Sequence, residues 1–294
     1  MMKPYKIFLA LLFTLAILIG IRYTNQNFNQ IEKKTYAGGL ALKHEFNHFY
    51  YGDEGDVVIS VDVEGGRLPF ENSIGFYYKP SRLAGYEGEI SYTRYEMKPT
   101  VSNPNRYEII IPRGEKGDKI FYYLELNDSD GNTVASLISG EDNLKETWVV
   151  FAGERPLILF MGHVLLMLAG FFFVSLAFLT SFSNLQNSLN NTVLGKQILW
   201  SVIFILLGSA ALGLNRQMFG TYWDGIPLGN DITASLALII FLYWLIMLIL
   251  MKGSAFKSSP SKNILPPGGA RILVIIGFII TTAAYLVPHG MGEF

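Results

Sequence analysis

Long apolar runs alternate with polar stretches along this chain, and the polar stretch after the first run is by far the longest. The apolar runs cover residues 7–21, 157–182, 198–214, 232–251 and 272–287. Each is long enough to cross, or nearly cross, a hydrocarbon core about 30 Å thick. The pattern therefore predicts five transmembrane helices, one at the N-terminus and four in the second half of the chain.

The basic residues predict how these helices are oriented. Lys252, Lys257, Lys262 and Arg271 lie between the last two runs, and Lys3 and Lys6 precede the first. Loops rich in Lys and Arg stay on the cytoplasmic side of an inner (plasma) membrane. We therefore expect the loop 253–270 in the cytoplasm, and residues 24–156, the loop 215–231 and the C-terminal tail outside the cell membrane. No small-x-small cleavage signal follows the first run, so residues 1–23 are interpreted as an uncleaved anchor.

The polar segment 24–156 alternates apolar and polar residues with a period of two. Short runs rich in β-branched and aromatic residues are separated by Gly, Pro, Asn and Asp, and they cover residues 57–63, 74–79, 90–95, 107–111 and 119–127. Runs of this length between turn signals are typical of β-strands. The segment predicts an all-β sandwich of about one hundred residues.

The stretch YEIIIPRGEKGDKIFYYLELNDSDGN, residues 107–132, resembles the later strands of immunoglobulin-like and fibronectin type III-like domains of bacterial cell surfaces. The resemblance covers roughly residues 40–152. It implies a fold and brings no catalytic residues, because such folds host many activities. The expected architecture is a membrane α-helical protein with an extracytoplasmic Ig/Fn3-like sandwich (24–156) inserted between the anchor and a four-helix module (157–294).

Composition supports the membrane class and removes several functions. Half of the residues (50%) are hydrophobic and 16% are charged, against about a quarter charged in soluble domains. The net charge of -1 and the lack of a basic, aromatic-rich patch exclude nucleic acid as a partner. Because the chain has no cysteine, disulfides, thiol nucleophiles and Cys-held metals are excluded.

One pentapeptide, His44-Glu45-Phe46-Asn47-His48, matches the H-E-x-x-H motif of zinc peptidases. On a helix this spacing places two imidazoles on one face for Zn²⁺, with the Glu as general base. Here turn residues follow within a few positions and strands follow those. We interpret the pentapeptide as part of the first strand of the sandwich, and we disfavour a zinc peptidase.

The other two histidines are candidates for a cofactor site. His163 lies early in the second apolar run and His289 follows the last, so the topology brings both to the outward side. Ionisable residues within spans are functional candidates. Three interpretations stay open: a b-type haem on both histidines with Arg155 or Arg216 near the propionates, copper held with Met161 or Met291, or a structural role in which His163 bonds a neighbouring helix. The residues concerned are Arg155, Met161, His163, Arg216, His289 and Met291.

The outward loop 215–231 is dense in aromatic and acidic residues. Trp223 suits a membrane interface, Asp224 precedes Gly225 in a predicted turn, and Asp231 suits the N-cap of the next helix. Small residues in the spans predict close helix packing, within the bundle or against a partner: Gly162, Gly170, Gly208, Ser209, Ala210 and Ala211.

Together these features predict a non-enzymatic protein, an accessory or docking subunit of a membrane complex with the sandwich as its binding module. The expected partners are the lipid bilayer and a protein bound through the sandwich or the bundle. The cofactor, haem b or copper, stays undetermined. The alternative is a purely structural or ligand-sensing membrane protein without a cofactor.

Overall fold

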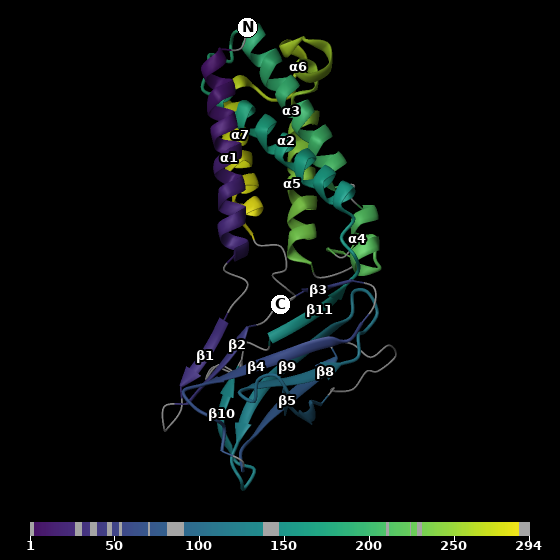
Figure 1. The fold of residues 1–294 in the computed structure, drawn as a ribbon. Helices are drawn as coiled ribbons and strands as arrows, with labels where there is room; N and C mark the ends of the chain where they lie inside the picture. Colours follow the sequence, from purple (N-terminus) through teal and green to yellow (C-terminus); the bar gives the residue numbers. More distant parts are fainter. Residues whose placement is uncertain are drawn as a thin grey trace. The chain divides into compact units, whose positions relative to one another are not determined.

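The computed structural model describes residues 3–26, 31–35, 40–45, 49–52, 55–69, 71–80, 91–137, 147–209, 212–223, 225–227 and 231–287. The chain forms two compact units, each described here by itself (Figure 1). The helical unit consists of Met1–Gln26, Pro156–Arg216 and Thr221–Phe294, and the β unit consists of Asn27–Arg155 and Gln217–Gly220.

The helices follow the apolar runs. They are α1 (Pro4–Gln26), α2 (Leu157–Ser181), α3 (Ser188–Ser209), α4 (Leu212–Phe219), α5 (Ile232–Leu250), α6 (Lys252–Lys257), the short 3₁₀ helix η1 (Pro260–Lys262) and α7 (Pro267–Leu286). Among the described residues, five segments are long and apolar enough to cross a membrane: Pro4–Thr24, Leu157–Ser181, Ser188–Phe219, Ile232–Leu250 and Pro267–Leu286. The predicted number of apolar helices is confirmed, and it is compatible with a membrane protein.

The third span differs from its prediction at both ends. The sequence predicts a helix over residues 198–214, but α3 begins at Ser188 and the apolar segment extends to Phe219. Residues 215–219 are therefore helical, and the loop predicted from residue 215 is wrong in its first five positions. The early start has a physical reason, because Asn191 in the first turns is buried (3% exposed) and hydrogen-bonded rather than solvated.

Close packing in the helical unit depends on two of the three predicted glycines. A Cβ on Gly170 would lie 2.8 Å from Ile205 Cγ1, and one on Gly208 would lie 2.7 Å from Met167 Sδ. Helix α2 therefore approaches α3 closely at both points, as small residues allow in membrane helices. A Cβ on Gly162 would meet nothing within 4 Å, so Gly162 makes no close helix contact among the described residues, and its contact with a partner stays a prediction.

The N-terminus and α6 lie at the same end of the helical unit (Figure 1). At this end Lys6 Nζ donates to Ser183 Oγ at 2.5 Å, and Arg271 Nε donates to the Ser181 carbonyl at 2.8 Å. Helix α1 ends and α2 begins at the opposite end. We refer to the end with α6 as the basic end.

The β unit contains two sheets. Its strands are β1 (Ile31–Thr35), β2 (Ala41–Glu45), β3 (Phe49–Tyr51), β4 (Val57–Glu64), β5 (Ser73–Pro80), β6 (Thr93–Glu96), β7 (Lys98–Pro99), β8 (Arg106–Ile111), β9 (Lys119–Asn127), β10 (Thr133–Leu137) and β11 (Thr147–Ala152). The first sheet has the order β1-β2-β4-β8-β7, and the second has the order β3-β11-β9-β5-β6 with β10 paired to β9. The described strand pairs are antiparallel except β11 with β3.

A single hydrophobic core joins the two sheets. Alternate residues of β4 and of β9 point inward. The buried set includes Val57, Ile59, Val61 and Val63 from the first sheet and Ile120, Tyr122, Leu124 and Leu126 from the second. Burying each such side chain contributes roughly 1.5–3 kcal/mol. The two sheets therefore stabilise each other, and the opposite face of each sheet is left for other roles.

Candidate functional site

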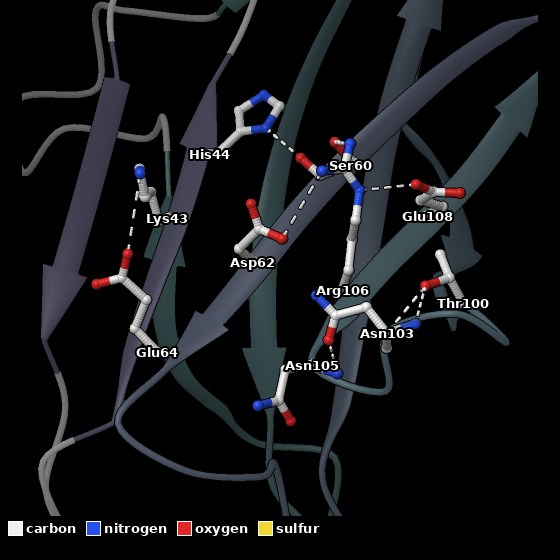
Figure 2. Close-up of polar contacts among 10 residues, drawn as sticks. All are labelled: Lys43, His44, Ser60, Asp62, Glu64, Thr100, Asn103, Asn105, Arg106 and Glu108. Atoms are coloured by element: carbon white, nitrogen blue, oxygen red, sulfur yellow. Dashed lines mark hydrogen bonds and ion pairs between the residues drawn. The ribbon is translucent and has the colours of Figure 1, made fainter.

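The outer face of the first sheet is a polar ladder (Figure 2). Arg106 Nε lies 2.8 Å from Glu108 Oε1, and Lys43 Nζ lies 3.9 Å from Glu64 Oε1. These side chains are between a third and a half exposed. Exposed pairs of this kind contribute little to stability, and they satisfy one another's charges, so this face has the character of a solvated surface.

The outer face of the second sheet differs from this polar ladder, because it carries stacked aromatic side chains. The Tyr77 and Tyr123 rings are stacked with centroids 4.7 Å apart and an interplanar angle of 4°, and Tyr92 packs edge-on against Tyr123 at 4.8 Å. Lys79 Nζ lies 4.7 Å from the centroid of Tyr92, and Arg94 on the neighbouring strand is exposed. We refer to Tyr77, Lys79, Tyr92, Arg94 and Tyr123 as the tyrosine face.

The hydroxyls of Tyr77 and Tyr123 stay protonated at neutral pH. Burial raises the pKa of Tyr77, and its hydrogen bond to Glu125 raises the pKa further, while Arg94 opposes this in part. Burial and the charge of Glu125 also raise the pKa of Tyr123. Neutral phenols offer an apolar ring together with a hydroxyl that donates and accepts. The face therefore combines flat apolar area, hydroxyls and two cations, a chemistry suited to binding.

His44 of the H-E-x-x-H motif lies on strand β2 and is 1% exposed. Its Nδ1 donates to the Ser60 carbonyl at 2.7 Å (Figure 2), and its Nε2 accepts from the Tyr122 hydroxyl at 2.8 Å. A carbonyl only accepts, so the bond to Ser60 sets this tautomer. Burial lowers the pKa of His44 to about 4, although the Ser60 bond acts in the opposite direction.

This geometry commits both ring nitrogens of His44 to cross-strand and cross-sheet contacts. Tyr122 belongs to the second sheet, so the histidine ties the two sheets together inside the core. The remaining motif positions 46–48 lie outside the described residues. Within the described ranges, no group of three or more His, Asp or Glu side chains is placed to hold a metal ion.

His163 lies on α2, where its Nδ1 donates to the carbonyl of Gly208 on α3 at 2.8 Å. The bond is the one expected of a histidine that fastens neighbouring helices. Met161 is 45% exposed on the same helix. His289 and Met291 lie outside the described residues, so the structure brings His163 together with α3 and says nothing of a shared histidine pair.

The two arginines predicted near a cofactor contact tyrosines instead. The Arg155 guanidinium lies 4.5 Å from the centroid of the Tyr51 ring and donates to its hydroxyl. Arg216 lies 4.6 Å from the centroid of the Tyr222 ring and also donates to its hydroxyl. Each pair combines a cation–π contact with a hydrogen bond.

The loop 215–231 is partly described. Trp223 Nε1 donates to the Ile226 carbonyl at 3.3 Å. Asp231 is the N-cap of α5, where its Oδ1 accepts from the backbone nitrogens of Thr233 at 2.7 Å and Ala234 at 3.1 Å. The predicted cap is confirmed. Asp224 lies outside the described residues.

The tyrosine face does not stand out as a site in the sequence. Its signal is the pair of doublets Tyr77-Tyr78 and Tyr122-Tyr123, each within a predicted strand. Because successive strand residues point to opposite faces, one tyrosine of each doublet must face outward. The pairing of β5 with β9, which places Tyr77 opposite Tyr123, is what turns two separate rings into a stacked pair.

Comparison of the chain with models of known protein families gives no match, and comparison with curated proteins gives no match either.

Proposed function

We propose that this protein is a non-enzymatic docking subunit of a membrane complex. The helical unit anchors it in the inner (plasma) membrane, and the β unit on the outer side binds a protein partner through the tyrosine face. The observation that carries the proposal is the stacked, partly exposed pair Tyr77 and Tyr123 with its flanking cations.

Tyrosine and arginine are the residues that dominate binding energy at protein interfaces. A tyrosine buries a large, rigid ring at a small cost in side-chain entropy. Stacking already fixes the rings of Tyr77 and Tyr123, so binding a partner would cost little further side-chain entropy at these two residues. In the described part of the first sheet, the polar ladder has no stacked tyrosine pair, and its Arg106 is already ion-paired with Glu108, so we place the binding side on the second sheet.

The strand order supports an immunoglobulin-type assignment for the β unit. In such a sandwich the strands A, B, E and D form one sheet, while C, F and G form the other. The order β2-β4-β8-β7 matches A-B-E-D, and the order β11-β9-β5 matches G-F-C, with β6 as an added edge strand. This fold presents binding surfaces in many unrelated proteins, so the surface chemistry decides the function.

The charge distribution supports an outward β unit. Helices α1 and α2 lead into and out of the β unit at the end of the helical unit opposite the basic end (Figure 1). Lys252, Lys257 and Lys262 mark the basic end, which the positive-inside rule assigns to the cytoplasm.

Photocrosslinking in native membranes tests the proposal. A benzophenone amino acid replaces Tyr123 in the full-length protein, and the matched control carries it at Tyr51, an exposed tyrosine on the opposite edge strand β3. We expect a discrete protein adduct from position 123 that disappears when Tyr77 and Arg94 are both changed to Ala. Equal adducts from positions 123 and 51, or no adduct from position 123, would contradict the proposal.

A second candidate is a cofactor site at His163. Metal-ligating histidines commonly donate their other ring nitrogen to a carbonyl, which orients the ligating nitrogen, and His163 donates Nδ1 to Gly208 in this manner. His289, with Met161 or Met291, would supply further ligands. A b-type haem would give a Soret band, whereas copper would give bound metal without one.

A further inference from the structure

The basic end of the helical unit contains a groove of about 600 Å³ between α5, α6 and η1. One wall is apolar and includes Leu245, Ile249 and Phe256. The rim carries Lys252, Lys257 and Lys262. An apolar wall and a cationic rim therefore lie in one groove, at the end of a helix long and apolar enough to span a membrane.

The apolar wall has the character of a lipid contact. Ile249 is 53% exposed and Phe256 is 62% exposed. Helix α5 is apolar beyond its first turn, so its exposed side chains there suit hydrocarbon rather than water. An acyl chain lying along this wall would cover both residues.

No acidic residue lies close in sequence to the lysines of the rim. That unit contains only three acidic residues, Asp224, Asp231 and Glu293, and none between residues 232 and 292. Asp231 begins α5, whereas the rim follows the end of that helix. An anion from outside the helical unit is therefore the natural counter-charge.

The loop that bears the lysines is held in place by a buried polar network. Asn263 Nδ2 donates to Asn191 Oδ1 at 3.1 Å and to Ser254 Oγ at 2.7 Å, and Ser254 Oγ donates to Asn191 Oδ1 at 2.8 Å. Ser254 is fully buried. A Cβ on Gly253 would lie 2.5 Å from the Ser259 carbonyl oxygen, so the turn is tightly closed. The backbone that bears the rim lysines is therefore held in place, unlike that of a flexible polybasic tail.

We propose that this groove binds an anionic phospholipid. The phosphate lies among Lys252, Lys257 and Lys262, and one acyl chain lies against Ile249 and Phe256. Basic pockets next to transmembrane helices are suited to anionic headgroups. A free phosphate would use the rim alone, and a zwitterionic lipid would use the wall without a net charge for the rim. The proposal is independent of the tyrosine face.

The test compares lipid binding to the purified full-length protein in detergent, using phosphatidylglycerol and phosphatidylcholine of equal chain length and native mass spectrometry. The first variant is Lys252→Gln/Lys257→Gln/Lys262→Gln. The matched control removes three exposed charges that do not line the groove and lie outside its helices, Arg22→Gln/Arg67→Gln/Lys98→Gln. A lysine near an anionic lipid surface contributes about a fivefold factor, so the rim variant should lose roughly 100-fold in phosphatidylglycerol affinity and the control little.

A further variant, Phe256→Ser, should weaken phosphatidylglycerol binding while leaving binding of glycerol phosphate unchanged. Thermal unfolding of each variant, measured in parallel, should match that of the parent protein, since all altered side chains are exposed. Equal affinity for the two lipids, or an equal loss in the rim and control variants, would overturn the proposal. Tighter binding of inorganic phosphate than of phosphatidylglycerol would also overturn it, because the site would then be one for a free anion.

Discussion

At the scale of single residues, His44 belongs to a sequence motif of zinc sites but has a structural role in the core of the β unit. Its spacing to Glu45 and His48 suggests zinc, but its ring nitrogens contact Ser60 and Tyr122. Strand placement could be predicted from the turn residues that follow. The contact to Tyr122 could not, because it joins two strands of different sheets that are far apart in the sequence.

The buried, neutral His44 predicts a pH-dependent stability of the β unit. Its pKa is about 4 in the folded protein and about 6.5 when unfolded. Between these values the unfolded state binds a proton that the folded state does not. Stability should therefore be constant above pH 7 and fall by about 3 kcal/mol in total as the pH drops from 6.5 to 4.

Hydrogen exchange of β4 and β9 peptides in the full-length protein, corrected for the intrinsic pH dependence of exchange, measures this effect. The variant His44→Gln should lose the fall between pH 6.5 and 4 whatever its stability at neutral pH. An unchanged fall in this variant would assign the pH dependence to other groups.

At the scale of elements, the sequence predicts that a helix or strand exists, and which of the two it is, better than it predicts where the element ends or which element it pairs with. The five apolar helices and the strands β4, β5, β8 and β9 follow from period and turn signals. The strands β3, β7 and β11 are short or paired with distant segments, so local pattern does not reveal them. The early start of α3 depends on the hydrogen bonds that Asn191 accepts from Ser254 and Asn263. These residues are far from Asn191 in the sequence, so local pattern does not reveal the contact.

The hydrogen bond from His163 to Gly208 predicts that the histidine fastens α2 to α3. His163→Ala should cost about 1 kcal/mol and lower the thermal midpoint of the purified protein by about 2–4 °C. Met161→Ala, an exposed change two residues away on the same helix, should have little effect. We expect the visible spectrum and metal content to stay the same in both variants.

A Soret band, or bound copper, that is present in the parent protein and lost in His163→Ala would contradict this structural role. It would favour the cofactor site instead. The same loss in His289→Ala would then assign the second ligand.

At the scale of the whole molecule, the division into a helical unit and a β unit can be anticipated from blocks of apolar and alternating sequence. The tyrosine face cannot be anticipated from the sequence, because it forms only when β5 pairs with β9 and places Tyr77 beside Tyr123. The lysine-rimmed groove is an intermediate case. Its charges are visible in the sequence, but their fixed arrangement depends on the buried Asn263 network.

We propose that the β unit and the lysine-rimmed groove lie on opposite sides of one membrane. The chain has no cysteine, so Ser91→Cys in the β unit and Ser258→Cys beside the groove, both exposed positions, can be labelled singly. In intact cells an impermeant thiol reagent should label Ser91→Cys and spare Ser258→Cys, and both should react after permeabilisation. Labelling of Ser258→Cys but not of Ser91→Cys in intact cells, or of both equally, would contradict the account.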